Sequence, residues 1–286
     1  MSTSEGSSVS DCWRDRSGQA WVREEARIDK TLVPFGRAAL ESLSLAAGQS
    51  VIDVGCGTGQ TLVEIAGRVG PSGKVLGVDV SEVMVERARQ RLAASGRANV
   101  EVELADAQSH SFEPARYDAV FSRFGVMFFE NTAAACMNLV SALKRGGRLA
   151  FVCWQSIERN PWAFLPASAV REQLRMEALP DFLTPGRPGP FRFADPEPLG
   201  EALMLAQCQT VEFKALELKV HLGGAETLEQ AVAYSLQVGP GARLLGDADA
   251  ATKDAVAATL RKVFAPFVTE SGVFMDARAW LVSGSR

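Results

Sequence analysis

The sequence predicts an α/β fold in which helices cover a doubly wound, mainly parallel sheet of seven strands. Short apolar runs alternate with helical periodicity from residue 51 to about residue 154, as in repeated β–α–β units. A glycine-rich turn joins the first apolar run to the first helical segment. Two further strand-like runs, at 209–222 and 277–283, complete the seven strands.

The first five strands are expected at 50–54, 74–80, 99–106, 117–122 and 148–154. Helix signals separate them. Gly70 and Pro71 stop the first helix, and Ser81 stands where it can cap the second. Asn131 or Thr132 is expected to start the helix that precedes the fifth strand.

The pattern changes after residue 154. Asn160 is expected to cap a helix whose first turn contains Pro161. The stretch 179–198 is crowded with proline and glycine, which predicts a surface loop. A mostly helical segment ending near residue 268 separates the last two strands, so we expect a helical insertion that serves as a lid in the C-terminal half.

Composition narrows the possible partners. The 286 residues, 47% of them apolar, suffice for one large core or one core with an added subdomain. A net charge of −4 and the lack of a Lys/Arg-rich tract argue against a nucleic-acid partner. The sequence has no run of about twenty apolar residues, so we do not expect membrane insertion. The five cysteines show no CxxC pair and no ligand spacing with either histidine, so no metal is expected. These features favour a cytoplasmic protein, a monomer or homodimer, that acts on a small molecule.

The glycine turn narrows the class of ligand. Gly55, Gly57 and Gly59 are followed by Gln60, which is one residue out of phase with the dinucleotide fingerprint, and no P-loop lysine follows. Asp53 precedes the turn, where its carboxylate would repel a pyrophosphate but suit an ammonium group. The ligand is therefore expected to be partly cationic.

The stretch "VIDVGCGTG" at 51–59 resembles the first motif of the class I S-adenosylmethionine-dependent methyltransferases, which have a Rossmann-like sheet. The cofactor half is also similar to the quinone-biosynthesis C-methyltransferases, although this likeness fades after the fourth strand. Acids before the turn, after the second strand and after the third strand, at 53, 79 and 106, reinforce the resemblance. It implies S-adenosylmethionine as cofactor.

The resemblance also implies a role for individual residues. Asp53 would hold the amino-acid end of the cofactor, Asp79 the two ribose hydroxyls and Asp106 the adenine amino group. Met84 would lie against the adenine face, and Ser122 near the sulfonium. The complete set of implied cofactor-binding residues is Asp53, Gly55, Cys56, Gly57, Thr58, Gly59, Asp79, Val80, Met84, Asp106, Ala107 and Ser122.

Trp13 and Trp21 flank a polar, helix-compatible stretch before the first strand. Similar enzymes fold such a segment across the cofactor as a lid. The alternative is that the segment forms a helix that packs on the sheet and does not contact the ligand. The expected organisation is a disordered tail at 1–12, an N-terminal helical lid at 13–48 and a class I methyltransferase domain at 49–286. That domain divides into a cofactor-binding half at 49–155 and a substrate and lid half at 156–286.

No catalytic residue is evident from the sequence. Methyl transfer from a sulfonium is an in-line displacement that needs a base only when the acceptor arrives protonated. His110, His221, Tyr234 and Arg123 are candidates. Arg123 could instead anchor a substrate carboxylate or a lid acid, or brace its loop.

Several large apolar residues are expected to form the acceptor pocket: Phe124, Met127, Phe128, Phe129, Trp154, Trp162 and Phe164. They favour a small, largely apolar acceptor, with the methylated atom (O, N or C) open. Methyltransferases that act on the amino group of adenine or the amide of glutamine carry an N/D-P-P-Y/F motif after the fourth strand. Residues 122–125, which stand at that place here, do not match it. An NAD(P)-dependent oxidoreductase and a non-catalytic cofactor-binding protein are the alternatives.

Overall fold

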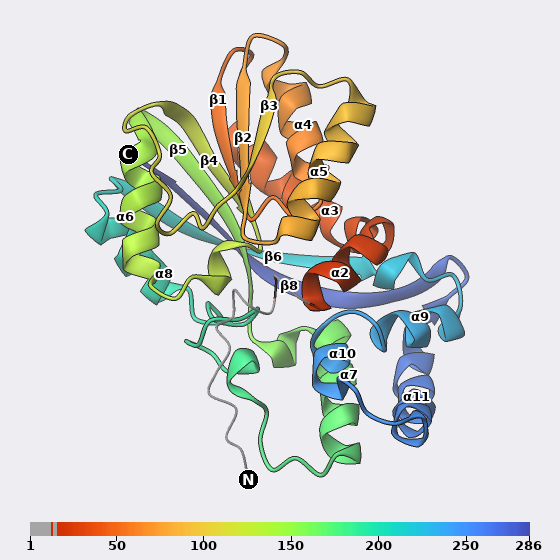
Figure 1. Cartoon of the computed structure of the whole chain (residues 1–286). Coiled ribbons are helices and arrows are strands. Elements are labelled where there is room, and N and C mark those ends of the chain that lie inside the picture. The colour runs from red at the N-terminus through yellow and green to blue at the C-terminus, as the bar shows by residue number, and fades with distance from the viewer. Residues whose placement is uncertain (1–12, 14–15) are drawn as a thin grey trace.

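The computed structural model describes residue 13 and residues 16–286, so the tail expected at 1–12 lies outside the described residues. The centre is one sheet of strand order β3-β2-β1-β4-β5-β8-β6, in which β8 runs antiparallel to both its neighbours (Figure 1). The strands are β1 Ser50–Val54, β2 Lys74–Asp79, β3 Val100–Leu104, β4 Tyr117–Arg123, β5 Leu143–Trp154, β6 Thr210–His221 and β8 Gly272–Ser285. A short strand, β7 Val268–Thr269, pairs with β8. The predicted fold class is confirmed.

Helices flank the sheet: α4 and α5 pack on β1 to β3, α3 packs on β4, β5 and β6, and α6 lies on the other face (Figure 1). The helices are α2 Arg16–Arg23, α3 Glu25–Leu43, α4 Gln60–Val69, α5 Glu82–Ser95, α6 Thr132–Ala142, α7 Pro161–Gln173, α8 Glu197–Leu205, α9 Leu228–Ser235, α10 Pro240–Leu245 and α11 Ala250–Phe264. No helix in the described part of the chain has the length and apolar character needed to span a membrane.

The local signals explain most boundaries. All five residues of β1 are buried, as expected of a central strand covered on both faces. The Asn131 side chain accepts a hydrogen bond from the Ala134 N–H and caps α6 as predicted. Asn160 occupies the N-cap position of α7, but its side-chain oxygen accepts from the Arg278 N–H and the Trp162 indole instead of from a backbone N–H of the helix.

The expected Ser81 cap is corrected in one respect. Ser81 holds the N-cap position of α5, but its hydroxyl makes no capping hydrogen bond. The Asp79 carboxylate, two residues earlier, accepts the Ser81 N–H at 2.9 Å. This bond fixes the backbone of the residue before α5, but it does not replace a serine cap, which would accept an N–H from the first turn of the helix.

The last strand, β8, is longer than the predicted 277–283, whereas β6 lies within the predicted 209–222. β8 pairs with β5 only over 279–285, whereas its pairing with β6 continues to His221 and Phe274. Residues 217–221 and 274–278 therefore form a two-stranded extension beyond β5, which we call the β6–β8 ribbon. Helices α7, α9, α10 and α11 pack on one another beside it (Figure 1). The ribbon and these helices place the C-terminal insertion over the ends of the parallel strands.

Candidate functional site

A cavity of about 770 Å³ lies between the carboxyl ends of the parallel strands, the N-terminal helices and the C-terminal insertion. This is where ligands bind in open parallel sheets. We call the end beside the glycine turn the cofactor half, after the role that the sequence led us to expect; it is lined by Val54, Gly55, Gly57, Val78, Asp79, Val80, Met84, Ala105, Asp106 and Ala107. We call the other end the acceptor half, also after its expected role; it is lined by Phe124, Met127, Phe128, Phe129, Trp154, Trp162, Leu222, Tyr234, Ser235, Leu236, Val238 and Pro240, among others.

The glycine turn forms the floor of the cofactor half. Gly55, Gly57 and Gly59 all have positive φ angles, of 70°, 55° and 84°. A Cβ on Gly55 would lie 2.9 Å from the Gly125 Cα, so this glycine is required by packing between β1 and β4. A Cβ on Gly57 would meet nothing nearer than the Met84 sulfur at 3.8 Å. Gly57 therefore offers bare backbone to the cavity, where a ligand can approach closely.

Asp79 ends β2 and lines the cofactor half. One carboxylate oxygen accepts the Gly57 N–H and the other accepts the Ser81 N–H, each at 2.9 Å. Burial raises the pKa of Asp79, and these backbone N–H groups act in the opposite direction. Each oxygen still has a free lone pair, so the side chain can bind two adjacent ligand hydroxyls while it holds the turn.

Asp53 lies behind the turn and is only 1% exposed. The Thr61 hydroxyl donates to Oδ2 at 2.5 Å, while Oδ1 has no hydrogen-bond partner among the described residues. Burial raises the pKa of Asp53 to about 7, although Thr61 and the charge of Arg123 act to lower it. A buried oxygen without a donor fits a ligand that brings an ammonium group, directly or through water.

The remaining residues of the implied cofactor site divide between wall and core. Val80, Met84, Asp106 and Ala107 line the cavity, and Asp106 accepts the Gln108 N–H at 2.9 Å, which shapes its loop. The implied residues outside the cavity wall are Asp53, Cys56, Thr58, Gly59 and Ser122.

The Ser122 hydroxyl has an internal role. It donates to the Val54 carbonyl at 2.8 Å and accepts the Gly125 N–H at 3.2 Å, so it ties β4 to β1 below the cavity. Cys56 is likewise buried, and burial raises the pKa of its thiol, which disfavours the reactive thiolate.

Two of the four catalytic candidates lie outside the cavity wall. His110 lies 3.5 Å from Glu103, and His221 stacks on Phe274 across the β6–β8 ribbon. Tyr234 and Arg123 do line the cavity. Burial raises the pKa of Tyr234, so its hydroxyl stays protonated and is a poor base.

Aromatic rings shape the acceptor half. Phe124 and Trp154 stack with ring centroids 3.9 Å apart and planes inclined by 11°. Trp162 lies 4.8 Å from Trp154, and its indole N–H donates to Asn160. Phe124 holds a positive φ of 64°, a conformation uncommon for a bulky residue. Of the predicted acceptor residues, only Phe164 is outside the cavity wall.

The N-terminal helices cover the cavity from one side. Trp13 and Trp21 line it, with ring centroids 5.3 Å apart, and Trp13 also meets Phe128 edge-on at 5.2 Å. The Trp21 indole nitrogen would lie 3.9 Å from a Cβ on Gly57, so α2 lies directly over the glycine turn. We call α2 and α3 the N-terminal lid.

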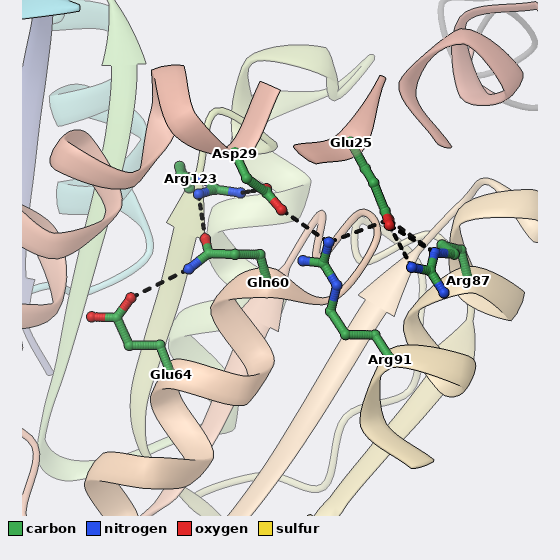
Figure 2. Close-up of polar contacts among 7 residues, drawn as sticks. All are labelled: Glu25, Asp29, Gln60, Glu64, Arg87, Arg91 and Arg123. Carbon is green, nitrogen blue, oxygen red and sulfur yellow. Dashed lines mark hydrogen bonds and ion pairs between the residues drawn. The ribbon is translucent and has the colours of Figure 1, made fainter. Parts of the chain in front are cut away.

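An ion-pair network fastens α3 to the helix α5 and to the end of β4 (Figure 2). Glu25 pairs with Arg87 at 2.5 Å and with Arg91 at 3.2 Å. Asp29 pairs with Arg91 at 2.9 Å and with Arg123 at 3.6 Å. Burial would raise the pKa of Glu25, but Arg87 and Arg91 lower it below its ordinary value.

Sequence reasoning missed the part of the wall that comes from the insertion. Leu222, Ser235, Leu236, Val238 and Pro240 line the acceptor half. Their sequence carries no motif, because they reach the cavity only through the packing of α9 and α10. No group of three or more potential metal-ligating side chains occurs among the residues that the structure describes.

Comparisons with known proteins agree with this geometry. A family described as "Methyltransferase domain" matches residues 51–147. The chain is 30% identical over 169 residues to the aklanonic acid methyltransferase DauC of Streptomyces sp. (strain C5), which covers 57% of this chain and 76% of that protein.

It is also 35% identical over 114 residues to the ubiquinone/menaquinone biosynthesis C-methyltransferase UbiE of Pseudomonas fluorescens (strain Pf0-1), covering 40% of this chain and 44% of UbiE. Among solved structures, a SAM dependent methyltransferase from Aquifex aeolicus aligns with a TM-score of 0.52 and 21% identity, over 71% of this chain and 92% of that one. This last likeness concerns the fold alone.

Proposed function

Because the chain belongs to the class I S-adenosylmethionine-dependent methyltransferases, we propose that it transfers the cofactor's methyl group to a small, largely apolar organic acceptor. The observation that carries the proposal is the single cavity in which bare glycine backbone and Asp79 lie at one end and stacked aromatic rings at the other. Such a cavity can hold a polar nucleoside and an apolar acceptor side by side.

The residues present suit the cofactor. Asp79 can bind the ribose hydroxyls, Met84 and Ala107 offer an apolar face for adenine, and Asp106 stands where it can accept from the adenine amino group. The unpartnered oxygen of Asp53 suits an ammonium group. When bound, the cofactor supplies an electrophilic methyl group on a sulfonium.

The chain's own contribution is alignment and exclusion of water. The N-terminal lid and the insertion close over the strand ends, and Phe124, Trp154 and Trp162 hold an apolar acceptor against the cofactor half. Fixing both reactants for in-line attack lowers the entropic part of the barrier.

An NAD(P)-dependent oxidoreductase is the less favoured reading. A pyrophosphate over the turn would lie close to Asp79 and to Asp53, and neither carboxylate has a basic partner on the turn itself. A protein that binds the cofactor without turnover would have the same cavity wall, so only an activity assay distinguishes it from a methyltransferase. The proposal includes a cytoplasmic monomer or homodimer without a nucleic-acid partner, which the net charge of −4 and the four cysteines in the described part of the chain, all free and buried, support.

Calorimetry and a product assay test the proposal. S-adenosylmethionine and S-adenosylhomocysteine should both bind, and NADH should not; a preference for NADH would overturn the assignment. Release of S-adenosylhomocysteine should then be measured across a panel of phenols, carboxylic acids, amines and activated carbon acids. Turnover of apolar members is expected, whereas cofactor binding with no turnover on any member would favour the binding-only reading.

A further inference from the structure

Arg123 is a cation built into the wall of the cavity. It is the last residue of β4, its side chain is 10% exposed, and it lines the cavity beside the glycine turn. The register between β1 and β4 pairs Asp53 with Phe121, so Arg123, two residues after Phe121, lies at the same edge of the sheet as the glycine turn. Burial lowers the pKa of Arg123, and the charges of Asp29 and Asp53 raise it. A guanidinium removed from water in this way requires an anion.

Neighbouring residues leave space for the Arg123 side chain and bind its guanidinium group. Gly36, inside α3, faces Arg123, and a Cβ at that position would lie 3.0 Å from the Arg123 Cδ. A glycine in a helix interior costs about 1 kcal/mol relative to alanine, so a packing reason is expected. Gln60, the first residue of α4, accepts from Nη1 at 2.6 Å (Figure 2). The guanidinium is thus placed between the lid and the start of the helix that follows the glycine turn.

Among the described residues, the Arg123 guanidinium makes one ion pair within 4 Å, and it is a long one. Its nearest acid, Asp29, is 3.6 Å away and makes a closer contact of 2.9 Å with Arg91. Across the network of Figure 2, three acids, Glu25, Asp29 and Glu64, accompany three arginines, so the residues drawn there balance in formal charge. A guanidinium has five N–H donors, and Gln60 takes one of them at hydrogen-bond distance.

We propose that Arg123 binds the carboxylate of the cofactor's amino-acid end, and that Asp29 links this contact to the N-terminal lid. The inference rests on the proposed function, because it requires S-adenosylmethionine over the glycine turn. The amino-acid end of that molecule is a zwitterion. Asp53 on β1 lies just behind the cavity wall, where its unpartnered oxygen can bind the ammonium group through a water, and Arg123 on the neighbouring strand has N–H donors for the carboxylate beyond the one that Gln60 takes.

The two ion pairs of Asp29 explain why binding of the carboxylate at Arg123 would be coupled to closure of the lid. Asp29 belongs to α3 and orients Arg123, while Arg91 links the same acid to α5, which carries Met84 in the cofactor half. Arg123 is therefore a residue that selects the cofactor's amino-acid end, and Asp29 is a positioning residue.

Two nucleoside probes test the proposal, S-adenosylhomocysteine and 5′-methylthioadenosine, which lacks the amino-acid end. Calorimetry should show that Arg123→Gln weakens binding of S-adenosylhomocysteine at least tenfold and changes that of methylthioadenosine less than twofold. Arg123→Lys should lose less, since it keeps a point charge without the planar fork. Arg91→Gln is the matched control: it removes a charge from the same network but not from the cavity wall, and the ratio of the two affinities should stay as in the wild type.

An unchanged affinity ratio in a folded Arg123→Gln protein, or an equal loss for both probes, overturns the proposal. If that variant does not fold, the wild type is titrated with decarboxylated S-adenosylhomocysteine, which keeps the amine; equal affinity for the two forms also overturns it. Failure of the wild type to bind S-adenosylhomocysteine at all would instead contradict the proposed function.

Discussion

Replacing Asp79 with alanine should weaken both the fold and cofactor binding. The carboxylate accepts the Gly57 and Ser81 N–H groups at 2.9 Å, and the substitution leaves both amides without this acceptor. A hydrogen bond to a charged group contributes about 1.5–3 kcal/mol, and removal of a buried carboxylate offsets part of the loss, so we expect a decrease in unfolding free energy of about 2–4 kcal/mol. Loss of the ribose contacts should also raise the Kd for S-adenosylhomocysteine about tenfold or more, equivalent to at least ~1.4 kcal/mol.

Urea unfolding measures the first effect, and calorimetry at a temperature where the variant is folded measures the second. Asp118→Ala is a suitable control, because Asp118 also accepts a backbone N–H, from Ser50 at 2.8 Å, but lies outside the cavity wall. It should lose stability and keep its affinity for S-adenosylhomocysteine. Unchanged affinity in a folded Asp79→Ala protein would remove this carboxylate from the ligand site.

Three further predictions concern the turn, the buried acid and the acceptor half. Gly55→Ala should destabilise the protein more than Gly57→Ala in thermal unfolding, because both strain a positive φ but only the former meets Gly125, at 2.9 Å; equal losses would contradict this packing role. The pKa of Asp53 is raised to about 7, so the folded state holds a proton that the unfolded state has released, and unfolding free energy should fall as pH rises from about 4 to 7. Asp53→Asn should flatten that dependence of the unfolding free energy on pH, as measured by denaturant titrations, and the same dependence in both proteins would refute the role of Asp53 in it. Trp154→Ala should reduce kcat/KM for whichever panel compound is turned over by about tenfold or more, while the Kd for S-adenosylhomocysteine stays within about twofold; loss of cofactor affinity instead would place the ring in the cofactor half.

The cofactor half was predictable because its signals are local. The glycines at 55, 57 and 59, and acids at the ends of successive strands, specify a turn and a cluster at one edge of the sheet whatever the rest of the chain does. The same reasoning could not place Ser122, whose hydroxyl is directed to the Val54 carbonyl by the packing of two strands. A residue's position after a strand predicts its neighbourhood but not the direction of its side chain.

The acceptor half was only partly predictable. Phe124 and Trp154 follow strands and were expected near the ligand, but Leu236 and Pro240 enter the wall through contacts between segments distant in sequence. His221 shows the converse: its position at a strand end suggested chemistry, yet a stacking contact with Phe274 across the ribbon accounts for it. Apolar periodicity cannot distinguish such roles, because it reports burial without reporting the partner.

The β6–β8 ribbon leads directly into Leu222 and contacts α7 and α9, so its length affects where the insertion's part of the acceptor wall lies. Side chains on paired strands alternate between two faces, so lengthening both arms of the ribbon by two residues would preserve which side chains face inward, while a change of one residue would invert them. Enlargement of the acceptor space by this route proceeds in steps of roughly 7 Å, the rise of two strand residues. Such a step leaves every contact of the glycine turn untouched, so the size of the molecule accepted can diverge between relatives that hold the nucleoside in the same way.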